Sequence, residues 1–134
     1  MKKEIIDLAK YRMQEASESL KDEGLLFQSS SYRGAMNRVY YGIFYAAKSL
    51  LSLMGLDSAK HSGVISLFHR ELIKPGLFPQ KIGKIINDAY DLRCEGDYKD
   101  FREISQDEVE EMLNKAKIFI AEAERVLKEM IKKA

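Results

Sequence analysis

Apolar residues recur every three or four positions along most of the chain, which is the spacing of helices with one buried face. Strand-like alternation of apolar and polar residues is absent. The pattern predicts helices over about 3–27, from serines 29–31 to Gly55, over about 62–73, from Pro79 to Gly96, and from Ser105 almost to the end. Because the connections are short, we predict an all-α fold: an antiparallel four-helix up-and-down bundle with an additional short helix, about five helices in all, forming a single domain over residues 1–134.

The second predicted helix is apolar or aromatic almost all the way round. One stripe consists of Met36, Tyr40, Ile43, Phe44, Ala47, Leu50, Leu51 and Met54. The opposite side carries Arg38, Tyr41, Tyr45 and Lys48. A helix of this kind is buried on more than one side. We therefore expect it at the centre of the fold, with its second face turned to a partner chain or a ligand.

Several local signals place the helix ends. Gly55 can adopt the left-handed conformation, with Leu56 packing back onto the helix. Ser105 and Glu108 have the spacing of a capping box. Gly96 is expected to end the fourth helix. The inward residues of the first helix are expected to be Ile5, Leu8, Ala9, Ala16, Leu20 and Phe27.

Length and charge narrow the class of protein. A domain of 134 residues buries about two-thirds of its unfolded surface, so it needs no disulfide or metal to fold. A net charge of +1 argues against a strongly basic nucleic-acid scaffold but leaves room for a local basic patch. Cys94 is the single cysteine, which fits a reducing compartment. The polar start and the lack of a long apolar run predict a cytoplasmic protein with no membrane contact.

Familiar enzyme motifs are absent from the sequence, including a phosphate-binding glycine loop and a nucleophile elbow. His61 and His69 lie eight residues apart and lack a carboxylate at metal-ligand spacing. We therefore expect neither a metal site nor a cofactor.

Arg93 continues the apolar stripe of the fourth helix, so its guanidinium needs an anionic or carbonyl partner. Two interpretations are open. Arg93 could pair with Asp97, four residues on, and stabilise the helix end while Tyr98 covers the core. Alternatively, Arg93 could face a ligand.

Two further groups of residues could bind ligands. Lys60 and Ser62 flank the start of the third helix, where free backbone N–H groups could hold an anion, although a simple capping role for Ser62 is favoured. Arg38, Tyr41 and Tyr45 share one helix face. Arginine stacked on tyrosine suits a nucleotide base, but it suits a dimer interface equally well, and the interface is the preferred interpretation.

Taken together, these motifs resemble the HEPN domain, whose name abbreviates "higher eukaryotes and prokaryotes nucleotide-binding". The resemblance covers essentially the whole chain in order. Its residues are Ala35, Arg38, Tyr40, Tyr41, Phe44, Ala46 and Ala47, then Leu50, Leu51, Gly55, Lys60, Ser62, Gly63, Val64 and Phe68, and finally Arg93, Asp97 and Tyr98.

The resemblance implies a bundle of about five helices that forms a homodimer. It also implies a minimal nucleotidyltransferase as partner in a toxin–antitoxin pair. Many such domains are metal-independent ribonucleases with an Arg followed, after four to six residues, by a His. Here Arg93 matches, but residues 98–100 are Tyr, Lys and Asp. Tyr98 is a poor substitute, because the unperturbed pKa of tyrosine is near 10.

Three hypotheses follow. The first is a nucleotide-binding helical dimer, or partner of a nucleotidyltransferase, in a toxin–antitoxin-like pair, with weak or no ribonuclease activity. The second is an RNA endonuclease that uses Arg93. The third is a non-catalytic interaction module. Candidate ligand-binding residues are Arg38, Tyr41, Lys60, Ser62, Arg93 and Asp97, and candidate catalytic residues are Arg93, Tyr98 and His61.

Overall fold

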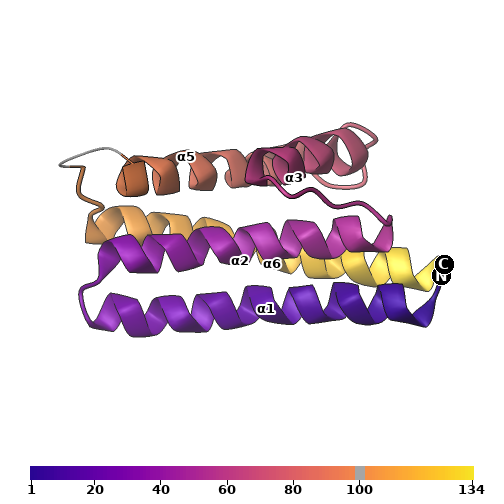
Figure 1. Cartoon of the computed structure of the whole chain (residues 1–134), viewed down its shortest axis with the longest axis horizontal. Helices are drawn as coiled ribbons and strands as arrows, with labels where there is room; N and C mark the ends of the chain where they lie inside the picture. Colours follow the sequence, from indigo (N-terminus) through magenta and orange to yellow (C-terminus); the bar gives the residue numbers. More distant parts are fainter. Residues whose placement is uncertain (99–101) are drawn as a thin grey trace.

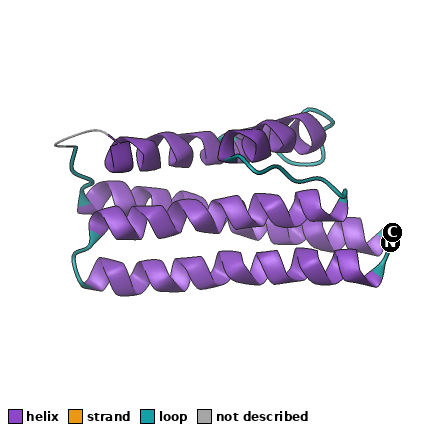
Figure 2. Cartoon of the chain, in the orientation of Figure 1, coloured by secondary structure: helices purple, strands orange, loops and turns teal. Residues whose placement is uncertain are grey.

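The computed structural model describes residues 1–98 and 102–134, and the side chains of 1–96 and 102–134. Its elements are α1 (Lys3–Gln28), α2 (Tyr32–Leu53), α3 (His61–Phe68), the π-helical turn η1 (His69–Ile73), α4 (Gln80–Gly83), α5 (Ile85–Tyr98) and α6 (Gln106–Lys132). The long helices alternate in direction along the chain (Figure 1). Within the described ranges all regular structure is helical (Figure 2), which confirms the predicted all-α bundle.

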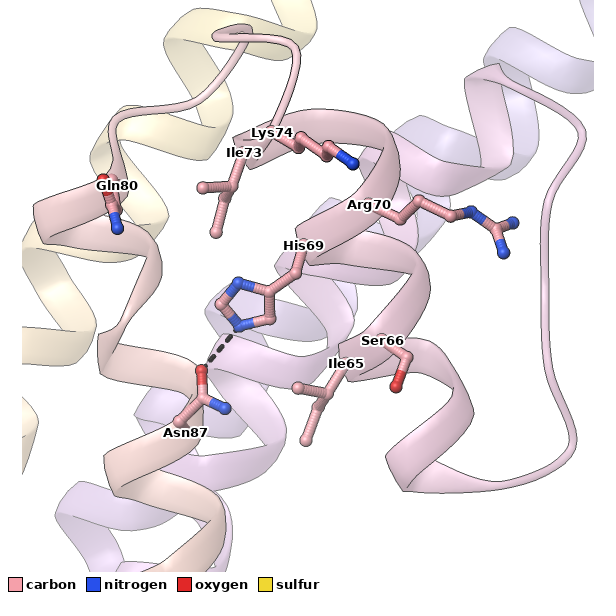
Figure 3. Close-up of a pocket in the computed structure, with 8 residues that line it drawn as sticks. All are labelled: Ile65, Ser66, His69, Arg70, Ile73, Lys74, Gln80 and Asn87. Carbon is pink, nitrogen blue, oxygen red and sulfur yellow. Dashed lines mark hydrogen bonds between the residues drawn. The ribbon is translucent and has the colours of Figure 1, made fainter.

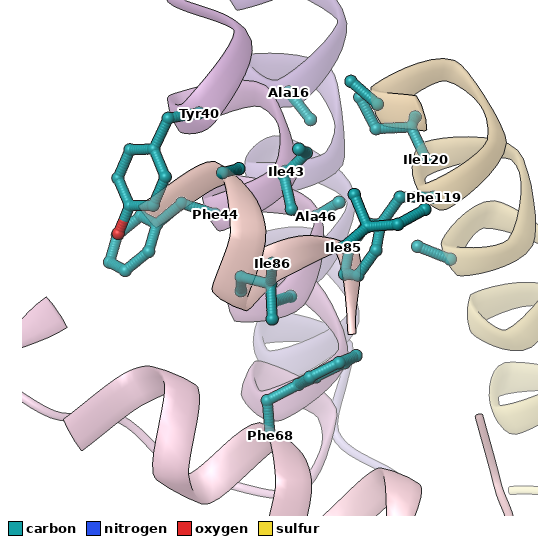
Figure 4. Packing of buried hydrophobic residues seen from close by; sticks show 14 of the residues in the cluster. Ala16, Tyr40, Ile43, Phe44, Ala46, Phe68, Ile85, Ile86, Phe119 and Ile120 are labelled. Atoms are coloured by element: carbon teal, nitrogen blue, oxygen red, sulfur yellow. The ribbon is translucent and has the colours of Figure 1, made fainter. Parts of the chain in front are cut away.

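Helix α2 lies at the centre of the bundle, as predicted, and packs against α1, α3, α5 and α6. Its apolar stripe is buried from Met36 to Leu51. Figure 4 shows Ile43 and Ala46 of α2 among side chains of α5 and α6. A second aromatic group joins the short segments to α6: the ring centroid of Phe119 lies 5.6 Å from that of Phe68 and 5.1 Å from that of Phe78. The core is therefore continuous from the long helices into the short ones.

Two predicted helix ends are confirmed. Gly55 has a φ of 71°, and the N–H of Leu56 donates to the carbonyl of Leu51 at 3.0 Å. At the start of α6, the N–H of Glu108 donates to Ser105 Oγ, while the Glu108 carboxylate accepts from the N–H of Ser105, each at 3.1 Å. These contacts satisfy backbone groups that a helix leaves unpaired at its ends.

The expectation that Gly96 ends the fourth helix is wrong, because α5 continues to Tyr98. Gly96 is buried, and a Cβ at this position would lie 2.9 Å from Ile104 Cγ1. The glycine therefore permits close packing rather than a helix end. The predicted fourth helix is also divided into α4 and α5, with Lys84 between them.

Leu8 is the exception among the inward residues expected on α1, since 44% of its surface is exposed. The buried face of α1 runs instead through Ala9, Met13 and Ala16. The predicted cap of the third helix also differs: α3 begins at His61, Lys60 is its N-cap residue, and Ser62 is exposed within the first turn.

The two ends of the chain lie at the same end of the bundle (Figure 1). A groove between α1 and α6 is lined by Lys10 and Met13 on one side and by Leu127 and Ile131 on the other, so the start of α1 runs beside the end of α6. Among the described residues, no helix combines the length and the hydropathy needed to span a bilayer.

Candidate functional site

Tyr40, a fully buried residue of α2, lies at the centre of the candidate site. Its hydroxyl oxygen is 2.7 Å from Nδ1 of His61, the first residue of α3. The imidazole of His61 also stacks on the ring of Phe44, with centroids 4.4 Å apart and planes inclined by 14°. The imidazole also stacks on the ring of Tyr40, with centroids 5.6 Å apart, so one hydrogen bond and two stacking contacts fix the position of His61.

Three cationic side chains surround these rings. The guanidinium carbon of Arg93, on α5, lies 5.1 Å from the ring centroid of Tyr40 and 5.4 Å from that of Tyr41. The guanidinium carbon of Arg38 lies 4.7 Å from the Tyr41 centroid, and Nζ of Lys48 lies 5.6 Å from the Phe44 centroid. These separations are typical of cation–π contacts. We call the residues Arg38, Tyr40, Tyr41, Phe44, Lys48, His61 and Arg93 the aromatic–cationic cluster.

The cluster alters the protonation of its titratable groups. Burial lowers the pKa of His61, and the positive charges of Arg93 and Lys48 lower it further. The pKa of Tyr40 is raised, mainly by burial, although Arg93 partly opposes the shift. At neutral pH the cluster therefore holds a neutral imidazole against a protonated phenol, with fixed positive charge beside them.

His61 reaches the cluster because the segment between α2 and α3 is anchored. Asp57 in this segment pairs with Lys48 at 3.3 Å and with Arg12 of α1 at 3.5 Å. Burial alone would raise the pKa of Asp57, but the hydrogen bond from the Ser58 N–H and the contact with Lys48 lower it overall. The segment is thereby tied to both α1 and α2.

Gly63 completes this anchoring. A Cβ at position 63 would overlap the side chain of Ser58, so a residue with a side chain would push the segment away from the first turn of α3. Ser58 Oγ also accepts a hydrogen bond from the N–H of Lys60 at 3.3 Å. Close packing at Gly63 therefore helps to set where His61 begins the helix.

The cluster brings together four residues that the sequence had singled out: Arg38, Tyr41, His61 and Arg93. Tyr45 adjoins it, with its ring centroid 5.6 Å from that of Tyr41. Lys60 and Ser62 are exposed at the start of α3 and are not among the contacts that form the cluster. The side chains of Asp97 and Tyr98 lie outside the described residues, and so does the proposed pair between Arg93 and Asp97.

Sequence reasoning placed Tyr40 and Phe44 in the apolar core and among the residues of the HEPN resemblance, but it did not name them as candidate site residues. The tyrosine hydroxyl was the available signal, because a buried phenol needs a hydrogen-bond partner. Across the described ranges, no group of three His, Cys, Asp or Glu side chains is arranged to hold a metal ion. The side chains of the cluster offer charge stabilisation by arginine and lysine, ring stacking, and proton transfer at an imidazole.

The fold and this cluster define an α-helical bundle with a cationic, aromatic site on its central helix. The family model described as "HEPN domain" matches residues 9–126, and the chain belongs to the HEPN family.

Relatives of similar length support this assignment. A UPF0332 protein of Thermotoga maritima is 34% identical over 123 residues, which cover 92% of this chain and 93% of that protein. Two proteins of Methanocaldococcus jannaschii carry the names "Putative toxin MJ0605" and "Putative toxin MJ0142". They are 34% and 35% identical to this chain, covering 87% and 86% of it, and 86% and 78% of their own lengths.

Proposed function

We propose that this protein is the toxin-like member of a two-component pair and that its aromatic–cationic cluster binds the phosphate and base of a nucleotide or of RNA. The observation that carries the proposal is the position of the Arg93 guanidinium over the rings of Tyr40 and Tyr41, beside His61. The relatives named as toxins support the toxin-like role.

The chemistry of the cluster suits such a ligand. Arg38, Lys48 and Arg93 supply positive charge from α2 and α5, and guanidinium groups match the geometry of phosphate oxygens. Tyr41 and Tyr45 are only partly buried, so their rings remain accessible to a base. Stacking of bases on aromatic side chains is the main way in which proteins hold single-stranded RNA.

Replacement of Arg93 tests the binding proposal. Calorimetry with ATP and with a short single-stranded RNA is expected to show salt-sensitive binding to the wild type. Arg93→Ala should weaken that binding by about 1.5–3 kcal/mol, the usual contribution of a hydrogen bond to a charged group. The matched control is Arg125→Ala, since Arg125 pairs with Glu122 on the exposed face of α6. No heat with either ligand, together with lower stability of Arg93→Ala, would support a purely structural role for Arg93.

The same surface suits a protein partner. We propose a homodimer with Arg38, Tyr41 or Tyr45 at or beside the interface, because tyrosine and arginine are enriched at interfaces. A minimal nucleotidyltransferase is the proposed second component of the pair. Sedimentation at micromolar concentration counts the chains, and copurification of the product of a neighbouring nucleotidyltransferase gene tests the partner.

RNA cleavage is the second candidate function, and the position of His61 favours it. The sequence predicts weak or no cleavage because the family motif lacks its His after Arg93. Yet His61, from a different helix, shares the Tyr40 ring with Arg93. A neutral imidazole could accept the proton of an RNA 2′-hydroxyl as the 2′-oxygen attacks the adjacent phosphorus. The P–O5′ bond would then break, leaving a 2′,3′-cyclic phosphate, and the 5′-oxygen would take a proton from water to become a 5′-hydroxyl, while Arg93 balances the developing negative charge.

The tautomer of His61 decides whether this step is available. If Nδ1 donates its proton to the Tyr40 oxygen, Nε2 carries the free lone pair that a base needs. Incubation with RNA in metal-free buffer compares the wild type with Arg93→Ala, His61→Ala and Arg125→Ala. Cleavage that only the first two variants lose would establish the nuclease. Absence of cleavage in the wild type would leave binding as the function of the cluster.

A further inference from the structure

A second concavity, distinct from the aromatic–cationic cluster, lies where α3 and η1 meet α4 and α5 (Figure 3). Its volume is about 720 Å³, within the range of about 300–1,000 Å³ that is common for small-molecule sites. We call it the η1 pocket. Its lining residues are Ile65, Ser66, His69, Arg70, Ile73, Lys74, Gln80 and Asn87.

The widened turn η1 forms one wall of this pocket. The N–H of Lys74 donates to the carbonyl of His69 at 2.8 Å, a spacing of five residues instead of the four of an α-helix. Such π-helical turns are rare and occur frequently at functional sites. The turn places His69, Arg70 and Ile73 on the wall of the pocket, with Lys74 directly after them.

The charged residues that line the η1 pocket all carry positive charge. Arg70 and Lys74 are cationic, and none of the lining residues is acidic. Glu71, which follows Arg70 in the sequence, pairs with Nε of Arg70 at 3.0 Å. The amides of Gln80 and Asn87 and the hydroxyl of Ser66 add hydrogen-bond donors. In Figure 3 Ile65 and Ile73 contribute apolar surface beside His69. This composition suits a compact anion attached to a partly apolar body.

The η1 pocket also lies between the two elements that bring His61 and Arg93 to the cluster. Nε2 of His69 lies 2.6 Å from Oδ1 of Asn87, and this hydrogen bond joins η1 to α5 (Figure 3). His61 begins α3, which continues directly into η1, and Arg93 follows Asn87 on α5. A ligand bound between these elements would therefore change the distance between His61 and Arg93.

We propose that the η1 pocket binds a small phosphate-bearing anion and that its occupancy shifts α3 relative to α5, and with it His61 relative to Arg93. The binding half of this proposal stands on the pocket alone, whereas the regulatory half rests on the proposed function of the cluster. Pyrophosphate is the probe, because it carries the required charge without a base that could stack on Tyr41.

The binding test follows the imidazole resonances of His69 by NMR during titration with pyrophosphate at constant ionic strength. A saturable shift is expected in the wild type, and the double variant Arg70→Gln/Lys74→Gln should weaken binding tenfold or more. The matched control, Lys81→Gln, removes an exposed lysine of α4 that does not line the pocket and should bind like the wild type. Equal weakening in the control, or no shift of His69, would overturn the site.

A short single-stranded RNA in a parallel titration distinguishes the two sources of phosphate. If RNA shifts His69 and pyrophosphate does not, the small-anion assignment is overturned and the pocket belongs to an RNA-binding surface. If pyrophosphate alone shifts His69, the proposal holds.

The coupling test follows the resonances of His61 in the same samples. Saturating pyrophosphate should move them in the wild type, and Asn87→Leu, which removes the acceptor for His69, should reduce that movement. Loss of the movement in Arg70→Gln/Lys74→Gln would show that it originates in the η1 pocket. Movement that persists in this double variant would place pyrophosphate at the cluster itself and overturn the coupling. Because the His69 shift is read separately, failure of nucleotide binding at Arg93 would not be mistaken for failure of the η1 pocket.

Discussion

The bundle combines two regions of different construction. Helices α1, α2 and α6 are uninterrupted over 26, 22 and 27 residues. The region from α3 to α5 is broken by the π-helical turn η1, by a turn at Gly76 with a φ of 84°, and by the short α4. His61, Arg93 and the η1 pocket all belong to this broken region. The three long helices form a frame whose α2 supplies Arg38, Lys48 and the aromatic rings of the cluster, and the broken region brings His61 and Arg93 to those rings.

Removal of the Phe119 side chain, where α6 packs against the broken region, should cause the largest loss of stability. Phe119 of α6 is fully buried against Phe68 and Phe78 of the broken region. Phe119→Ala is therefore expected to lower the free energy of unfolding by about 3–5 kcal/mol. Chemical denaturation followed by circular dichroism measures the change. The neighbouring Ile118 is 53% exposed, so Ile118→Ala should stay within about 0.5 kcal/mol of wild type. A similar loss of unfolding free energy in both variants would contradict the assigned packing of Phe119 against the broken region.

The same substitution made once in each region sharpens the comparison. Gly63→Ala should destabilise by about 1–3 kcal/mol, because the new methyl group meets Ser58 and forces the segment to move. Gly24→Ala, in α1, has no heavy atom within 4 Å of the added Cβ and should stabilise by about 0.5–1 kcal/mol.

Thermal denaturation compares these two variants, and NMR of the His61 imidazole reports whether its contact with Tyr40 survives. A Gly63→Ala variant with wild-type stability and an unchanged His61 signal would refute the role of Gly63.

Neutralisation of one cation should have the smallest effect on the fold and a clear effect on the cluster. Burial, Arg93 and Lys48 lower the pKa of His61 below the usual value of 6.5. Lys48→Met should therefore raise the pKa of His61 towards that value, as measured by NMR titration. Lys115→Met, which removes a lysine paired with Glu111 on α6, should leave the pKa of His61 unchanged.

The sign of the stability effect follows from linkage. The folded state binds the His61 proton less readily than the unfolded state, so the stabilisation by neutral His61 is complete above pH 6.5. It declines as the pH falls from 6.5 towards the lowered pKa of the folded state. His61→Gln should remove this part of the pH dependence, and an unchanged pH profile in the variant would contradict the assigned environment of His61.

The frame could be predicted from the sequence because its helices are long enough for the apolar period to be unambiguous. The stripe from Met36 to Leu51 identified α2 as the central helix, and Ser105 with Glu108 identified the start of α6. The broken region was harder to predict. The π-helical turn contains neither proline nor glycine. Gly83 directly precedes the division at Lys84, but like Gly96 it also permits close packing, because a Cβ there would overlap the side chain of Ile73.

The candidate site was predictable only in part. Arg38 and Tyr41 share a helix face, and this follows directly from their spacing. The approach of His61 and Arg93 to the same residue, Tyr40, depends on the path of the segment before α3. The contacts of Asp57 and the close packing at Gly63 set that path. Such contacts between distant residues leave no periodic trace in the sequence. This is why the sequence alone does not place His61 against Tyr40.

The shared location of the two chain ends has a consequence for engineering. Because the start of α1 runs beside the end of α6, a short flexible linker could join them and give a circularly permuted chain. New ends opened at the exposed turn around Gly76 would separate α3 and η1 from α4 and α5 in sequence while leaving the three long helices covalently continuous. In such a chain, labels could be attached separately to the frame and to the broken region. Local unfolding of each region could then be measured on its own.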